Sequence, residues 1–72
     1  MVEMYKQQNG WVIRYFQAPL NRWMYLVSYR PNGQCRAVWS TDYTYAHGYS
    51  KKKATEIHNI LKFQRHYNEA TP

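Results

Sequence analysis

The tripeptide Pro31-Asn32-Gly33 constrains the fold of this chain most, because it separates two runs rich in aromatic and β-branched residues, 23–30 and 34–41. Proline fixes the first position of a turn, asparagine tolerates the second and glycine adopts the left-handed third. This pattern predicts a β-hairpin with a three-residue loop.

The run at 11–17 has the same character and predicts a further strand before the hairpin. Pro19 ends it, because proline cannot continue a β-ladder, so 18–22 is interpreted as the first loop. Residues 10–41 are therefore predicted to form a three-stranded antiparallel β-meander. Residues 1–9 fit either an edge strand or an N-terminal extension draped over the core, and the pattern leaves both open.

A helix is predicted from Lys51 to Tyr67, after a connecting segment at 42–50 that fits a short strand or an extended loop. Ser50 is a good N-cap residue, and the apolar spacing becomes helical from Ala54 onward. The apolar stripe contains Ala54, Ile57, Ile60 and Leu61, with Phe63 or Tyr67 as an extension. The predicted fold is α+β, with one C-terminal α-helix packed across one face of the meander. Residues 1–72 make a single small domain whose tail, 68–72, is expected to fray.

The loop lengths predict which side chains share a face of the sheet. With loops at 18–22 and 31–33, Tyr15 pairs with Tyr25 and Tyr29 pairs with Cys35. One face then has no charge and carries Trp11, Ile13, Tyr15, Trp23, Tyr25, Val27, Tyr29, Cys35, Ala37 and Trp39. The other face has three arginines beside a smaller apolar patch and carries Val12, Arg14, Phe16, Met24, Leu26, Ser28, Arg30, Arg36, Val38 and Ser40. We expect the helix to cover the uncharged face.

Composition favours a polyanionic or acidic partner. Ten Lys and Arg stand against four Asp and Glu, giving a net charge of +6, and small basic chains favour nucleic acid, anionic membrane or an acidic protein surface. No apolar run is long enough to span a membrane, and the N-terminus lacks a signal-peptide pattern. The absence of a long apolar run leads us to expect no membrane partner. The single Cys35 cannot form an internal disulfide, so we expect a reducing, cytoplasmic compartment.

Enzymatic function has little support in the sequence. No pair of the four carboxylates lies in an obviously buried context, and Cys35 lies just past the hairpin turn, where nothing local orients a base. His47, His58 and His66 lack metal-ligand spacing, and the three glycines are too scattered for a phosphate loop. We therefore expect no catalytic residue, no metal and no cofactor.

The basic residues form two groups that suit nucleic-acid binding. Lys51, Lys52 and Lys53 occupy the first turn of the predicted helix, where the helix dipole disfavours cations, so an external phosphate is expected there. Arg14, Arg30 and Arg36 are predicted on the open sheet face, where they could enter a major groove and contact guanine edges. The alternatives are lysines that are merely solvated and arginine stems that cover the apolar patch. For Tyr43, Tyr45 and Tyr49, packing in the core or the loop is favoured over base stacking.

A three-stranded sheet followed by a helix that opens with Gly48-Tyr49-Ser50-Lys51-Lys52-Lys53-Ala54 resembles the N-terminal arm-binding domains of phage and transposon tyrosine integrases. Those domains resemble plant AP2 domains and lay their sheet in the major groove. The resemblance covers about residues 10–66, and it implies a groove role for the three sheet arginines. In the integrases a catalytic domain follows, so this chain would be a free-standing relative, a fragment, or an unrelated protein with the same topology. Its size, basicity and aromatic content suit a phage or mobile-element protein.

Double-stranded DNA, ahead of RNA, is therefore the expected partner. The competing hypothesis is a protein-interaction module, either a homodimer or an inhibitor of a host protein, that uses an apolar sheet patch of Val12, Phe16, Met24, Leu26 and Val38. The balance of arginines and apolar residues on that face distinguishes the two hypotheses. If Phe16, Met24 and Leu26 are instead buried under the helix, the aromatic face is the exposed one, and stacking on single strands gains support.

Overall fold

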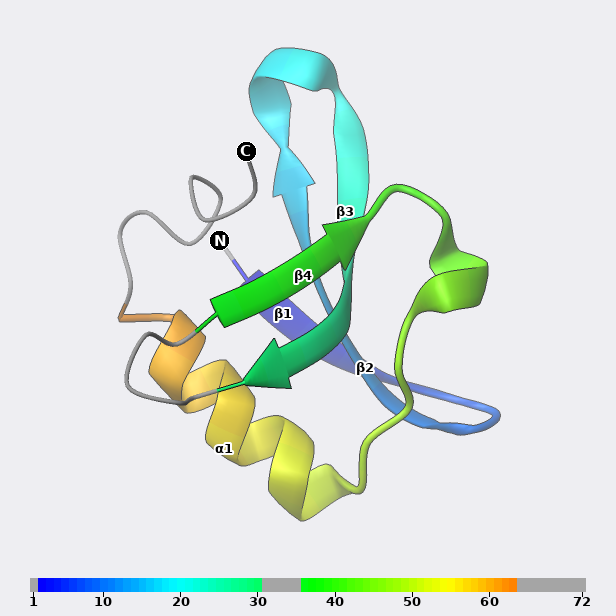
Figure 1. The fold of residues 1–72 in the computed structure, drawn as a ribbon, viewed down its shortest axis with the longest axis vertical. Coiled ribbons are helices and arrows are strands. Elements are labelled where there is room, and N and C mark those ends of the chain that lie inside the picture. The colour runs from blue at the N-terminus through cyan, green and yellow to red at the C-terminus, as the bar shows by residue number, and fades with distance from the viewer. Residues whose placement is uncertain (1, 31–35, 64–72) are drawn as a thin grey trace.

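The computed structural model describes residues 2–30 and 36–63, except for the side chain of Arg36. Its elements in chain order are β1 (Val2–Gln7), β2 (Gly10–Gln17), the 3-10 helix η1 (Ala18–Leu20), β3 (Arg22–Arg30), β4 (Arg36–Ser40), the 3-10 helix η2 (Tyr43–Tyr45) and α1 (Lys51–Leu61) (Figure 1). The strands form an antiparallel sheet in the order β1-β2-β3-β4. The α+β class with a C-terminal helix is confirmed. No helix within the described ranges is long and apolar enough to cross a membrane.

The predicted number of strands is wrong, because the N-terminal residues form a fourth strand. Strand β1 pairs with β2 along its whole length, from Val2 opposite Tyr15 to Gln7 opposite Gly10. Its apolar residues alternate, and Val2 is only 3% exposed because it contributes to the core. Of the two alternatives for residues 1–9, the described part therefore forms an edge strand.

The predicted register between β2 and β3 is also wrong, by one residue. Tyr15 pairs with Met24 rather than with Tyr25, because the connection between Gln17 and Arg22 contains only residues 18–21. It closes as a 3-10 turn with Asn21 in the left-handed region, at φ 52°. A one-residue shift exchanges the two faces of a strand.

This exchange reverses the predicted placement of four side chains on β3. Met24 and Leu26, expected on the open face, are 7% and 0% exposed in the core, whereas the alternation turns Trp23 and Tyr25 to the opposite face.

Pairing between β3 and β4 also differs from the prediction. Tyr29 pairs with Ala37, and the expected partner Cys35 lies outside the described residues. An irregularity between Leu26 and Ser28 shifts the register, so that Leu26 pairs with Trp39. Trp39 lies opposite buried Leu26 and Ala37 is two residues away on β4, so both face the core as expected.

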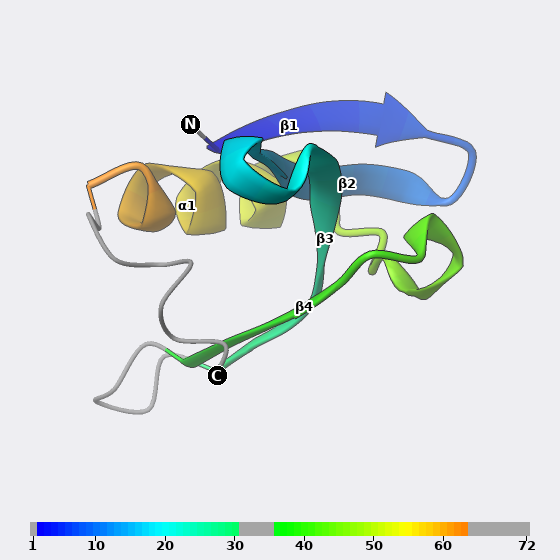
Figure 2. The same cartoon turned by 90° about the horizontal axis from the view of Figure 1, so that it is seen from above.

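The sheet splits along the line between β2 and β3. Strand β3 pairs with β2 only as far as Tyr25, and beyond it β3 turns away together with β4 (Figure 2). The chain before α1 fills the split: Trp11 and Tyr49 exchange two backbone hydrogen bonds of 2.7 and 2.8 Å, and the His47 amide donates to the Leu26 carbonyl at 3.1 Å. The connecting segment therefore joins the two halves of the sheet.

Glycine makes this close approach possible. A Cβ at Gly48 would lie 2.4 Å from the carbonyl oxygen of Asn9, in the turn between β1 and β2. Gly10, with φ at +130°, would place a Cβ 2.8 Å from the carbonyl oxygen of Tyr49. A side chain at either position would push the connecting segment away from the β1–β2 hairpin.

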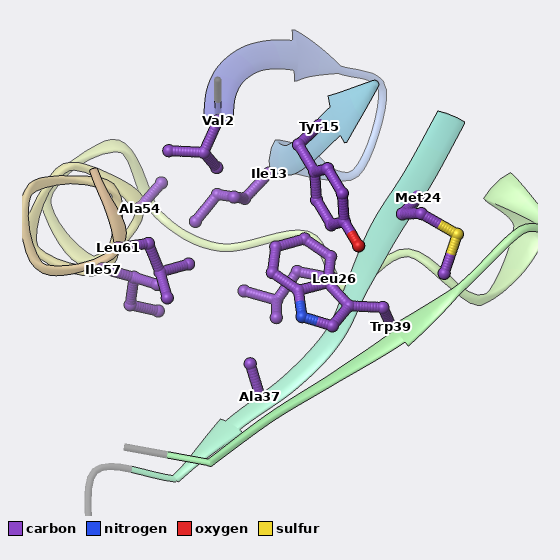
Figure 3. Packing of buried hydrophobic residues seen from close by; sticks show 10 residues of the cluster. All are labelled: Val2, Ile13, Tyr15, Met24, Leu26, Ala37, Trp39, Ala54, Ile57 and Leu61. Atoms are coloured by element: carbon purple, nitrogen blue, oxygen red, sulfur yellow. The ribbon is translucent and has the colours of Figure 1, made fainter. Parts of the chain in front are cut away.

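The core lies between α1, the β1–β2 hairpin and the paired strands β3 and β4, and side chains from all three converge in it (Figure 3). Helix α1 packs against β1 and β2 and contributes Ala54, Ile57 and Leu61. The apolar stripe is narrower than predicted, because Ile60 is 41% exposed and Phe63 is more exposed still. Ser50 is the N-cap as predicted and accepts a hydrogen bond from the Lys53 amide at 3.2 Å. The helix ends at Leu61, before the predicted Tyr67, which lies outside the described residues together with the tail.

Candidate nucleic-acid interface

The sheet face that points away from the core carries a group of aromatic residues around one arginine. We call it the outer aromatic face, formed by Tyr5, Arg14, Phe16, Trp23, Tyr25 and Tyr43. The pairing explains most of this group: Phe16 lies opposite Trp23, Arg14 opposite Tyr25, and Tyr5 is two residues from Arg14's partner Glu3. Side chains two residues apart on a strand share a face, so these residues are neighbours on one surface.

Arg14 is the centre of the outer aromatic face. Its guanidinium carbon lies 3.8 Å from the ring centroid of Trp23 and 4.4 Å from that of Tyr5, both within cation–π distance. Its Nε donates a hydrogen bond to Glu3 Oε1 at 2.8 Å. Desolvation lowers the pKa of Arg14, but hydrogen bonds to Glu3 and Tyr25 and the charge of Glu3 outweigh it and raise that pKa above its ordinary value. Arg14 therefore stays charged, and its guanidinium lies within cation–π distance of two rings.

Aromatic rings continue from Arg14 in two directions. Phe16 packs edge-on against Trp23, with ring centroids 5.3 Å apart, and Tyr25 contacts Tyr43 of η2 at 6.4 Å. Phe16 is 39% exposed and Tyr43 is 61% exposed. Among the aromatic residues in the described part of the chain, only Tyr15 and Trp39 are buried. A small domain that leaves this much aromatic surface in contact with water presents a surface suited to a partner.

A local hydrogen-bond network holds Tyr43 in place. Asp42 caps η2, because its Oδ1 accepts from the Thr44 amide at 3.0 Å and from the Thr44 hydroxyl at 2.7 Å. The backbone and then the side-chain hydrogen bond from Thr44 lower the pKa of Asp42 below its ordinary value. The cap is therefore complete while the carboxylate is ionised, and it weakens only as the pH falls through this lowered pKa.

The structure does not bring the three predicted groove arginines into one row. Arg14 lies opposite Tyr25 on β3. Arg30 is exposed and lies five residues beyond Tyr25 on the same strand, which corresponds to about 16 Å at the usual rise per residue. The backbones of Arg30 and Arg36 pair across β3 and β4. Arg14 is thus separated from the other two by half a strand.

The three predicted helix-start lysines occupy the first turn of α1 and are all exposed. The ammonium of Lys51 lies 5.6 Å from the ring centroid of Trp11, and that of Lys53 lies 4.0 Å from a carboxylate oxygen of Glu56. The first turn contains no acidic residue. Positive charge and the helix N-terminus therefore coincide at this end of α1.

The apolar patch predicted for a protein partner does not exist as a surface patch. Three of its five members are buried: Val12, Met24 and Leu26 are 4%, 7% and 0% exposed. Only Phe16 and Val38 remain exposed, and they lie on different strands. The one-residue register shift places Met24 and Leu26 in the core, and the segment before α1 covers Val12.

Sequence reasoning missed Glu3, Tyr5, Trp23 and Tyr25 as members of the site. The alternation of Val2 and Met4 with Glu3 and Tyr5 was the available signal for β1, and it assigns Glu3 and Tyr5 to the outer side. The expected packing role of Tyr43 and Tyr45 does not hold, since both are more than 60% exposed, whereas half-buried Tyr49 packs against the core.

The described residues define a small α+β domain with an exposed aromatic face, and they contain no group of three side chains placed to bind a metal ion. Comparisons with protein-family models, curated proteins and solved structures find no match for the chain. The geometry of the outer aromatic face and the charge of the chain are therefore the features that bear on function.

Proposed function

We propose that this domain binds single-stranded nucleic acid, with unpaired bases stacked on the outer aromatic face and phosphates attracted by the positive charge of the chain. The observation that carries the proposal is the combination of exposed rings with a sandwiched arginine in a chain of net charge +6. Proteins that bind single strands combine aromatic stacking with basic grooves in the same way, and arginine contributes cation–π contacts.

Single strands fit this geometry better than the duplex groove expected from the sequence. An arginine that contacts a guanine edge needs its donors available to the base, whereas Arg14 lies against the rings of Tyr5 and Trp23 and already donates its Nε–H to Glu3. In a duplex the base faces are stacked on one another and are not available to Trp23 or Tyr43. Burial of Met24 and Leu26 removes most of the apolar patch on which the protein-partner hypothesis depended.

The test compares one oligonucleotide of about 12 nucleotides, labelled at its end, as a single strand and as a duplex by fluorescence anisotropy. DNA and RNA single strands are measured in parallel. We expect the single strand to bind more tightly, and Tyr43→Ala to weaken that binding by about 1–3 kcal/mol, roughly 5- to 150-fold. Tyr43→Phe should keep most of the affinity, because the ring remains.

Phe63→Ala is the matched control, since Phe63 is an exposed ring beyond the end of α1 and away from the outer aromatic face. The Phe63→Ala variant should bind the single-stranded oligonucleotide with the same affinity as the wild type. Tighter binding to the duplex would overturn the single-strand proposal and return support to groove binding. Absence of binding to any oligonucleotide at low salt would favour a protein partner instead.

A further inference from the structure

A small pocket opens where the β1–β2 turn meets the segment before α1. Its volume is about 330 Å³, at the lower end of the range for small-ligand pockets. It is lined by Gln7, Gln8, Asn9, Val12, Tyr43, Thr44, Ala46 and Gly48. The close approach of Gly48 to Asn9 forms one wall, so the pocket exists because the connecting segment fills the split in the sheet.

The lining of the pocket selects the chemistry of a ligand. It contains no acidic or basic side chain, which disfavours an ion as the ligand. Three side-chain amides from Gln7, Gln8 and Asn9 offer donors and acceptors together, and Tyr43 adds a ring. These groups suit a neutral planar molecule that carries both donors and acceptors on its edge.

The pocket adjoins the outer aromatic face through two of its lining residues. Gln7 Nε2 donates a hydrogen bond to the hydroxyl of Tyr5 at 2.8 Å, and the ring of Tyr43 contacts that of Tyr25. Val12 lies two residues from Arg14 on β2 and so faces the same side of the sheet. A nucleic-acid strand whose bases stack on the outer aromatic face would therefore reach the pocket at one end of that face.

We propose that this pocket accepts one unpaired nucleobase of the bound strand and selects it by hydrogen bonds from the side-chain amides. The inference rests on the proposed function and deepens it, because the outer aromatic face alone has no means to distinguish bases. Glutamine and asparagine amides match the N6–N7 edge of adenine with two hydrogen bonds, so adenine is the favoured occupant.

The experiment titrates the ¹⁵N-labelled full chain with the four free deoxynucleosides, which carry no phosphate and therefore probe base recognition without electrostatic attraction. We expect deoxyadenosine to shift the side-chain amide resonances of Gln8 and Asn9 and the backbone resonance of Gly48 more than the other three deoxynucleosides do. Gln8→Met removes one amide at similar size, and Ala46→Leu fills the pocket. Both should weaken deoxyadenosine binding severalfold, whereas Asn59→Ala, which removes an exposed amide on α1, should not.

A second readout separates failure of the pocket from failure of the proposed function. Anisotropy with single-stranded oligonucleotides should show weaker binding when every adenine is replaced by thymine, and Gln8→Met should abolish this difference. If oligonucleotides bind but the four nucleosides give equal shifts, or shifts only near Trp23, the pocket inference is overturned and the proposed function stands. If no oligonucleotide binds, both are overturned.

Discussion

In the proposed nucleic-acid interface, the contacts of Arg14 have opposing effects on binding. The rings of Tyr5 and Trp23 hold the guanidinium at the outer aromatic face, while Glu3 occupies one of its donors at 2.8 Å. A phosphate that approaches Arg14 must therefore compete with a carboxylate. The side chains of Arg14 and Glu3 are 26% and 48% exposed, so solvent screens this ion pair and its net contribution to stability is small.

Glu3→Gln is expected to raise the affinity for single-stranded oligonucleotides by about 2- to 5-fold, because it removes the competing charge and keeps a hydrogen-bond acceptor. Anisotropy titration at fixed salt measures the change. Glu56→Gln alters the net charge equally on α1, where the contact to Lys53 is 4.0 Å, and it should give a smaller gain. Weaker binding by Glu3→Gln would show that Glu3 positions Arg14 rather than competes for it.

At the scale of elements, the sequence predicted the features that depend on neighbouring residues, which are the start of the helix and the positions of the strands around Pro19. Ser50 marks the start of α1 because capping depends on neighbouring residues, and the runs around Pro19 predicted strands in nearly their observed places. The face of β3 was predicted wrongly, because it depends on a single residue of loop length. The left-handed Asn21 shortens that loop, and no pattern in 18–22 indicates it.

The same limit explains why the site was predicted only in part. The positions of Lys51, Lys52 and Lys53 follow from the N-cap, so their placement on α1 was correct. The partners of Arg14 depend on the register with β3 and on the existence of β1. The register changes with one residue of loop length, and the short alternation in 2–5 was compatible with a draped extension as well as with a strand.

The three helix-start lysines lie together in the first turn of α1, so replacing all three tests whether they contact phosphates. Replacing Lys51, Lys52 and Lys53 by alanine should lower the salt dependence of single-strand binding, with the slope of log affinity against log salt changing by about 2 if each lysine contacts one phosphate. The melting temperature should stay equal or rise, because cations oppose the dipole at a helix N-terminus. An unchanged slope would remove these lysines from the interface. A large fall in melting temperature would give them a structural role.

At the scale of the whole molecule, the charge of +6 attracts any polyanion, whereas in the proposed function the outer aromatic face binds only exposed bases. Both single strands and duplexes should therefore bind at low salt, and selectivity should emerge as salt increases. Screening shortens the range of electrostatic attraction from about 10 Å at 0.1 M to about 3 Å at 1 M, but it does not weaken stacking. Counterion release also makes the slope per phosphate steeper for duplex, about −0.9 against −0.7.

We accordingly predict that the ratio of single-strand to duplex affinity rises with salt in a series from low to moderate concentration. For Tyr43→Ala the ratio should rise less, because part of the salt-resistant stacking is lost, while Phe63→Ala should follow the wild type. The measurement is a pair of anisotropy titrations at each salt concentration, with the same labelled strand alone or annealed. A ratio that stays constant would mean that charge alone governs binding. A ratio that falls would mean that contacts to the duplex itself, such as groove contacts from Arg30, outlast the electrostatic term.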